Sequence, residues 1–215
     1  MLLIAHRTPA TREACERVAA AGAQVFEADV QVDERGRIVV SHYLPFGRVL
    51  HRDNWRFRWH TGAAHDPLLT DVIARVPEQC LILVDLKEKT PGRRARLISG
   101  LIDAFPDRAR FRVCGHREDD LEAVRRAGFR TWRTAGDPRE LAALLADGRL
   151  PDDAVSIRHR LLTRDVVDRL HAQTPNVIAW TVNDVIRARQ LRAMAVDGVT
   201  TDRTAVLTEL SSSAN

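Results

Sequence analysis

Short apolar runs alternate with amphipathic segments along the whole chain. Several of the runs are apolar at nearly every position, which is typical of strands that are buried on both faces. The predicted strands are Leu2–Ala5, Gln24–Ala28, Ile38–Ser41, Cys80–Leu86, Arg110–Cys114, Arg130–Arg133, Ala154–Ile157, Val177–Thr181 and Gly198–Thr201. Apolar residues recur at helical spacing in the segments between most of them, namely Arg12–Ala21, Arg93–Ala104, Asp119–Ala127, Pro138–Ala146, Thr163–Ala172 and Asp184–Ala195.

The strand and helix patterns form eight β/α units once Ile38–Ser41 is set apart. That run follows the turn at Asp33–Gly36, so it predicts a β-hairpin extension after the second strand. Eight such units predict an α/β fold, a small (β/α)8 TIM barrel that spans residues 1–215 as one domain. A doubly wound open sheet is the alternative, but the first strand runs into His6-Arg7-Thr8-Pro9 and not into a glycine-rich dinucleotide turn.

Composition and charge narrow the function classes. The net charge is +4, and the charged residues form no block of one sign, so no nucleic-acid partner is expected and no stable protein partner is implied. Cys15, Cys80 and Cys114 are widely spaced, which predicts buried thiols and no disulfide or zinc site. The start of the chain has no basic leader and only a short apolar run, so we expect a cytoplasmic protein.

One segment interrupts the alternation. Residues Tyr43–His65 show no clear period, yet they hold five of the eleven aromatic residues, interleaved with arginines. An irregular loop of this length within a compact domain is usually functional. Aromatic residues beside arginines can also rest on lipid head groups, and the plainer alternative is that they close the barrel mouth.

Polar residues gather where the predicted strands end, which is where TIM barrels carry their active sites. His6 and Arg7 follow the first strand, and His42 follows the hairpin run. Glu27 and Asp29 are two residues apart on one strand, as are Asp85 and Lys87 on the next, so each pair points to one side. Trp180, Asn183 and Asp202 close the last two strands.

These residue types indicate phosphate chemistry around a metal ion. Three carboxylates without cysteine suit a hard cation such as Mg²⁺ or Ca²⁺. Histidines beside cations and a metal suit proton transfer and attack at phosphorus. Lysine is otherwise scarce, since 31 of the 33 basic residues are arginine, so Lys87 at a strand end points to a role for its ammonium group.

The same residues form an ordered set of motifs: His6-Arg7, Glu27-Ala28-Asp29, His42, Asp85-Leu86-Lys87, Trp180-Thr181-Val182-Asn183 and Thr200-Thr201-Asp202. In this order they resemble the glycerophosphodiester phosphodiesterase family, of the phosphatidylinositol-specific phospholipase C-like superfamily. The resemblance implies a TIM barrel that hydrolyses a small phosphodiester to an alcohol and a phosphomonoester, which is sn-glycerol 3-phosphate for the family substrate.

The resemblance also implies a role for each motif. It implies that Glu27, Asp29 and Asp85 bind one divalent cation, Mg²⁺ or Ca²⁺. It makes His6 and His42 the catalytic acid–base or nucleophilic pair. It also implies that Arg7 and Lys87 bind the phosphate and that Trp180 lines the substrate site.

The chain departs from the family pattern around these motifs. Thr8 replaces the usual glycine, His42 is followed by Tyr43 in place of aspartate, and Asp85 replaces the commoner glutamate, as in related sphingomyelinase D enzymes. Two alternatives follow. One is a lysophospholipase D or sphingomyelinase D-like activity on lipid phosphodiesters, with head groups at Tyr43–His65, and the other is a non-catalytic barrel that binds a phosphate ligand.

Overall fold

Eight parallel strands form a closed barrel. The computed structural model of the chain describes residues 1–41, 44–46, 50–53, 56–59 and 66–212. The barrel strands are β1 (Leu2–Ala5), β2 (Val25–Val32), β7 (Leu81–Leu86), β8 (Phe111–Gly115), β9 (Arg130–Ala135), β10 (Ala154–Arg158), β11 (Val177–Trp180) and β12 (Gly198–Thr201). Strand β1 pairs with both β12 and β2, which closes the sheet. The predicted TIM barrel is confirmed, and the open sheet is wrong.

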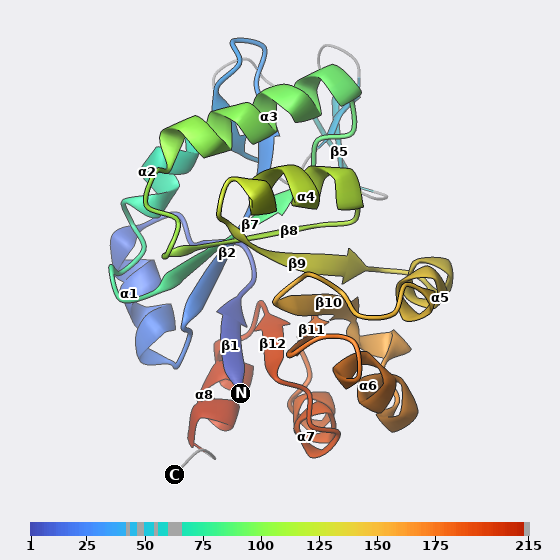
Figure 1. The fold of residues 1–215 in the computed structure, drawn as a ribbon. Coiled ribbons are helices and arrows are strands. Elements are labelled where there is room, and N and C mark those ends of the chain that lie inside the picture. The colour runs from blue at the N-terminus through green and yellow to red at the C-terminus, as the bar shows by residue number, and fades with distance from the viewer. Residues whose placement is uncertain (42–43, 47–49, 54–55, 60–65, 213–215) are drawn as a thin grey trace.

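Helices surround this barrel on its outer side (Figure 1). They are α1 (Arg12–Ala20), α2 (Leu69–Ile73), α3 (Pro91–Ala104), α4 (Glu118–Arg126), α5 (Pro138–Ala146), α6 (Arg164–His171), α7 (Val185–Ala193) and α8 (Thr204–Ser212). Side-chain caps begin several of these helices, since Asp137, Thr163 and Asp184 each accept a backbone N–H of the first turn. These caps fix where each helix leaves the mouth of the barrel.

Apolar side chains fill two layers. A small cluster lies inside the barrel and consists of Ile4, Val25, Leu83, Cys114, Trp132, Ala154 and Ile178. The larger cluster lies between the barrel and its helices. Gly198 is required on the inner side, because a Cβ there would lie 2.6 Å from Ile178 Cδ1 and 3.1 Å from the Leu2 carbonyl oxygen.

The second strand is longer than the sequence predicts. It was expected to end at Ala28, but β2 continues to Val32 and pairs antiparallel with β3 (Ile38–Val40). The pairing of Val30 with Val40 extends the strand beyond the barrel mouth, so Asp29 lies within β2 together with Glu27 and not just past its end. The predicted β-hairpin extension is confirmed.

The segment that was expected to be an irregular loop contains strands. Its described parts form β4 (Leu44–Phe46), β5 (Leu50–Asp53) and β6 (Arg56–Trp59), which pair antiparallel as a separate three-stranded sheet. The expectation of an irregular loop is therefore wrong for these residues. The side chains of residues 42–65, His42 and the aromatic residues included, lie outside what the structure describes.

The cysteines behave as predicted. Cys15, Cys80 and Cys114 are buried and free. Among the helices of the described chain, none has the length and apolar character that crossing a membrane requires.

Candidate active site

Three carboxylates meet at the carboxyl end of neighbouring strands. Glu27 and Asp29 lie on β2 and Asp85 lies on β7, where the register places it opposite Asp29. One oxygen from each carboxylate lies within 4.8 Å of the other two. Glu27 and Asp29 are buried, and the Asp85 side chain is 13% exposed. The structure therefore brings together the three predicted metal ligands, which we call the acidic triad.

Lys87 holds a positive charge within this triad. Its Nζ lies 2.5 Å from Asp85 Oδ2 and 3.1 Å from Asp29 Oδ1. Burial by itself would lower the pKa of the Lys87 ammonium, but the charges of Asp85, Asp29 and Glu27 outweigh it and hold the pKa well above its usual value. Lys87 therefore stays charged at any physiological pH.

The triad still carries more negative than positive charge. Burial raises the pKa of the Glu27 carboxyl well above its usual value, and the neighbouring Asp29 and Asp85 raise it further. The Oδ1 atom of Asp85 is buried and accepts no hydrogen bond from the described residues. Carboxylate oxygens whose negative charge is only partly neutralised fit a hard divalent cation such as Mg²⁺ or Ca²⁺. The residues present therefore match the cation that the resemblance implies.

His6 is oriented by a carboxylate from the last strand of the barrel. Its Nδ1 lies 2.6 Å from Asp202 Oδ1. A carboxylate only accepts hydrogen bonds, so Nδ1 carries the proton and Nε2 is the acceptor of the neutral ring. Asp202 in turn accepts a hydrogen bond from Asn183 Nδ2 at 2.7 Å. His6 is therefore the member of the predicted catalytic pair whose tautomer the structure explains.

Asp202 is an ionised carboxylate in this arrangement. Burial would raise its pKa, but hydrogen bonds from Asn183 and His6, with the charges of His6 and Arg7, lower it below the usual value. Asn183 completes the bond network, because its Oδ1 accepts the backbone N–H of Asp202 at 2.9 Å. A negative Asp202 stabilises positive charge on the His6 ring, as the buried carboxylate of a catalytic triad does.

The turn after β1 is fastened to Glu27. The backbone N–H of Arg7 donates to Glu27 Oε2 at 2.7 Å, and Arg7 has a φ of 61°, in the left-handed region. The hydroxyl of Thr8 donates to the Glu27 carbonyl oxygen at 2.8 Å. Thr8 thus makes a side-chain contact that the family's glycine would lack. These bonds hold the Arg7 backbone against the triad. The Nε of the Arg7 side chain lies 4.0 Å from Asp29 Oδ2.

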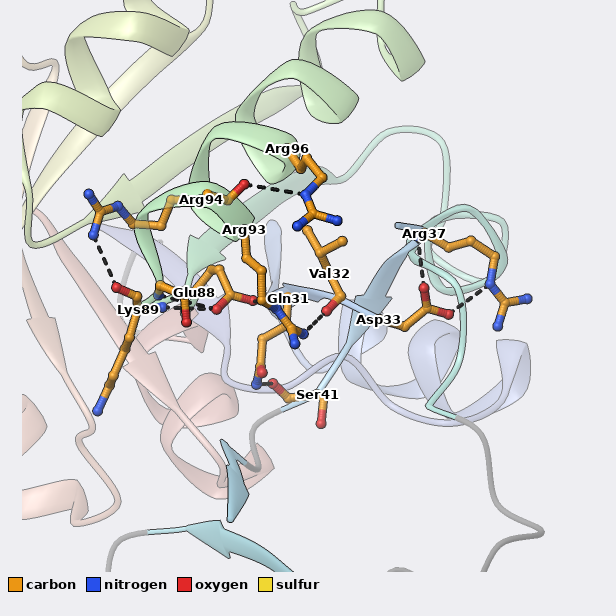
Figure 2. Close-up of polar contacts among 12 residues, drawn as sticks. Gln31, Val32, Asp33, Arg37, Ser41, Glu88, Lys89, Arg93, Arg94 and Arg96 are labelled. Atoms are coloured by element: carbon orange, nitrogen blue, oxygen red, sulfur yellow. Dashed lines mark hydrogen bonds and ion pairs between the residues drawn. The ribbon is translucent and has the colours of Figure 1, made fainter. Parts of the chain in front are cut away.

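His42 falls outside the described residues, so its predicted catalytic role stays a prediction. The described chain reaches Ser41, whose backbone N–H donates to the Asp29 carbonyl oxygen at 2.9 Å. The Gln31 amide donates to the Ser41 carbonyl oxygen at 2.8 Å, as Figure 2 shows. Both contacts hold the residue before His42 at the acidic end of β2.

The loop that follows Lys87 is also fixed to β2. Glu88 accepts a hydrogen bond from Arg93 Nε at 3.0 Å and from the backbone N–H of Lys89 at 3.2 Å. Arg93 also donates to the carbonyl oxygen of Val32 (Figure 2). This network holds the start of α3 beside the hairpin, so the position of Lys87 is set from both sides.

Trp180, the predicted substrate-lining residue, ends β11 at the barrel mouth. Its Nε1 donates to the Ser156 carbonyl oxygen at 3.0 Å, and the ring is half-buried. A Cβ added at Gly136 would lie 3.3 Å from the edge of the ring, so glycine leaves room for this orientation. The indole is thereby held in one place across the mouth from the acidic triad.

Sequence reasoning missed several polar groups at the mouth. Asp202 and Asn183 were identified at strand ends, but the contact of Asp202 with His6 was not predicted. A second histidine–carboxylate pair joins His116 Nδ1 to Glu140 Oε1 at 2.9 Å, after β8 and within α5. The position of His116 directly after a strand was the signal that could have revealed it.

Solved structures share this fold over almost the whole chain. A glycerophosphodiester phosphodiesterase from Thermotoga maritima matches with a TM-score of 0.72 and 18% identity, over 100% of this chain and 98% of its own. An Oleispira antarctica phosphodiesterase, solved in complex with the product sn-glycerol-3-phosphate, matches with a TM-score of 0.73 and 15% identity, over 98% and 97%. At these identities the likeness establishes the fold.

Sequence comparison matches part of the chain to the same family. One curated relative, the Bacillus subtilis protein YhdW, is provisionally named a glycerophosphodiester phosphodiesterase and is 42% identical over 48 residues. That match covers 22% of this chain and 20% of YhdW, so it spans about a fifth of the relative. Residues 118–206 match the model of the glycerophosphoryl diester phosphodiesterase family. The resemblance found in the motifs is thus confirmed, since residues 118–206 of the chain match the glycerophosphoryl diester phosphodiesterase family, a family of phosphoric diester hydrolases.

Proposed function

We propose that this protein hydrolyses glycerophosphodiesters to an alcohol and sn-glycerol 3-phosphate, with one divalent cation held by Glu27, Asp29 and Asp85. The observation that carries the proposal is the acidic triad, whose three oxygens lie within 4.8 Å at the barrel mouth beside Lys87. The family match over residues 118–206 supports the reaction class, and the product named in the Oleispira antarctica complex supports the glycerol side of the substrate.

The bound cation would polarise the phosphate and offset its charge. Mg²⁺ and Ca²⁺ both suit three carboxylate oxygens, and the assay below distinguishes them. Arg7 and Lys87 supply the remaining positive charge to the phosphate oxygens. Lys87 does so with a compact ammonium group that Asp85 and Asp29 hold in the triad, whereas the backbone of Arg7 is held by the contact of the turn to Glu27.

His6 is the base in this proposal. Its Nδ1 proton is held by Asp202, so Nε2 takes a proton from the attacking hydroxyl or water as the new P–O bond forms. Asp202 stabilises the imidazolium that results. His42, the other member of the pair that the resemblance implies, would then be the acid that gives a proton to the alcohol oxygen as the second P–O bond breaks. Trp180 lines the side on which the alcohol lies.

Two other functions remain as alternatives. Activity on lipid phosphodiesters would use the Tyr43–His65 segment, and liposome co-sedimentation of Trp55→Ala and Trp59→Ala variants tests that contact. A barrel without catalytic activity would bind a phosphodiester tightly with no turnover. Neither is favoured by a contact in the described residues, and both are outcomes of the assay that follows.

The test is a panel of glycerophosphodiesters assayed with Mg²⁺, Ca²⁺ or EDTA, with release of sn-glycerol 3-phosphate as the readout. We expect turnover with a divalent cation and none with EDTA. His6→Ala should lower kcat by a factor of about 10² to 10⁴. Absence of turnover with every diester and cation would overturn the proposal.

The chain offers a matched control for His6. His171 Nε2 lies 2.8 Å from Asp197 Oδ2, a histidine–aspartate pair at the opposite end of the barrel. His171→Ala removes the same type of contact away from the mouth. Activity that falls equally in both variants would indicate loss of folding and not loss of a catalytic base.

A further inference from the structure

Arg158 extends into the barrel mouth from its inner face. Ala154 on β10 belongs to the cluster inside the barrel, whereas Val155 and Ile157 pack against the helices. Side chains alternate along a strand, so Ser156 and Arg158 share the inner face with Ala154. Arg158 is exposed and lies in register with Trp180 on β11. Its side chain therefore leaves β10 at the mouth, from the position paired with Trp180.

The Arg158 guanidinium has no partner among the residues that the structure describes, and neither has that of Arg160. Two other cations at the mouth are compensated. Lys87 contacts two carboxylates, and Arg117 lies 3.5 Å from Asp119. Arginine side chains at a site of chemistry that lack an internal carboxylate are available to an external anion.

The loop that carries these arginines is fixed in place. It forms the short 3₁₀ helix η1 (His159–Leu161), and the Arg187 guanidinium donates to the carbonyl oxygens of His159 at 2.5 Å and Leu162 at 3.0 Å. Burial lowers the pKa of His159, and the charges of Arg187, Arg160 and Arg158 lower it further. The loop therefore presents a positive surface on a rigid support.

The position of this surface relates it to the acidic triad. Around the closed barrel the order of strands is β1, β2, β7, β8, β9, β10, β11 and β12, which sets β10 opposite β2. A phosphate at the acidic triad would lie on the β2 and β7 side. The alcohol beyond it would then extend over Trp180 towards Arg158, so the arginines lie where the far end of the alcohol would be.

We propose that Arg158, assisted by Arg160, forms a second anion subsite, which makes the preferred substrate a phosphodiester whose alcohol carries a phosphomonoester or carboxylate. This inference rests on the proposed function and adds the class of alcohol. A guanidinium pairs with either anion through two parallel hydrogen bonds. The same unpaired charge repels a quaternary ammonium, so a choline diester is disfavoured.

The test compares two diesters that differ by a single phosphate, glycerophosphoinositol and glycerophosphoinositol 4-phosphate, with glycerophosphocholine as the cationic case. We expect kcat/KM to be about tenfold higher for the phosphorylated diester, as one charge-assisted contact gives. Arg158→Gln should bring the ratio close to one, and added salt should reduce it in the unmodified protein. Arg17→Gln removes an exposed arginine from the far end of α1 and should leave the ratio unchanged.

The outcomes separate this inference from the proposed function. Hydrolysis of both inositol diesters with equal kcat/KM, or a preference that survives in Arg158→Gln and Arg160→Gln, would overturn the subsite while the phosphodiesterase stands. Should no diester be hydrolysed, the proposed function fails, and calorimetric titration of both diesters decides the subsite by itself. Equal Kd values for the pair would then overturn it.

Discussion

The ammonium of Lys87 lies 2.5 Å from Asp85 Oδ2 in the centre of the acidic triad. It also reaches Asp29 Oδ1 at 3.1 Å, so one lysine is shared by carboxylates of two neighbouring strands. Three buried or nearly buried carboxylates repel each other, and Lys87 offsets part of that repulsion. The same side chain is thus placed to stabilise the site without a cation and to bind phosphate with one.

Replacement of Lys87 by methionine tests this dual role. Without a divalent cation, Lys87→Met should lose about 1–3 kcal/mol of unfolding free energy, because the triad loses its internal positive charge. Addition of Mg²⁺ or Ca²⁺ should restore most of this loss, so the cation raises Tm more in the variant than in the unmodified protein. Thermal melts with EDTA and with each cation measure the difference.

Lys89 provides the control for Lys87. It is the other lysine of the chain, and its side chain is exposed and outside the site. Lys89→Met should change stability by less than about 0.5 kcal/mol. A Lys87→Met variant as stable as Lys89→Met with EDTA would contradict the proposed balance of charges.

The raised pKa of Glu27 predicts that ionisation of this carboxyl lowers the free energy of unfolding. A carboxyl whose pKa is raised by folding binds its proton more tightly in the native state. The cost is therefore absent below the unfolded pKa of about 4.5 and grows as the pH rises above it. In EDTA, Glu27→Gln should stabilise the protein by about 1 kcal/mol or more at neutral pH, and the difference should vanish towards pH 4.

Urea unfolding at a series of pH values measures this effect. Glu27→Gln should also abolish most of the rise in Tm that the divalent cation produces, because one ligand oxygen has lost its charge. Glutamine can still accept the Arg7 N–H, so the turn after β1 is preserved. Lower stability of Glu27→Gln at neutral pH in EDTA would refute the prediction.

Replacement of Asp202 should lower turnover and leave the binding of the divalent cation intact. Asp202→Asn keeps the volume but offers His6 an amide, which no longer fixes the proton on Nδ1 or stabilises the charged ring. We expect kcat to fall by a factor of about 10² to 10⁴ while the Tm rise produced by the divalent cation is unchanged. Asp197→Asn, in the histidine–aspartate pair at the other end of the barrel, is the matched control. A kcat for Asp202→Asn within a few-fold of the unmodified protein would rule out positioning of His6 by Asp202.

Most of the site could be predicted because the topology of a barrel brings strand ends together. Glu27, Asp29 and Asp85 lie on adjacent strands and Lys87 directly follows the second of them, so the sequence spacing alone places them on one face. The contact of His6 with Asp202 joins residues 196 positions apart, from the first and last barrel strands. It depends on closure of the barrel and on side-chain conformation, which periodicity does not specify.

The hairpin and the following sheet show where local sequence pattern fails to predict strands. Strand β2 passes the barrel mouth because β3 gives it further backbone partners, a tertiary effect that local pattern cannot predict. In Arg56–Trp59, arginines alternate with aromatic residues at a period of two, which is a strand signal. A signal of only four residues does not stand out in a segment with so many arginines, so this strand is not predicted from the sequence.

Thr8 explains why the departure from the family's glycine need not disturb the turn. Its hydroxyl and its backbone N–H both donate to the Glu27 carbonyl oxygen at 2.8 Å. Thr8→Val keeps the volume but removes the hydroxyl, and should cost about 1 kcal/mol of unfolding free energy. Thr8→Ser keeps the hydroxyl and should retain most of the stability.

The same turn positions Arg7, so Thr8→Val should also raise KM for the diester more than it lowers kcat. Urea unfolding and steady-state kinetics on the three proteins measure both effects. If serine and valine destabilise equally, the hydroxyl bond to Glu27 contributes nothing and the side chain acts through packing alone. If KM stays constant while stability falls, the bond supports the fold without orienting Arg7, which would separate the turn from phosphate binding.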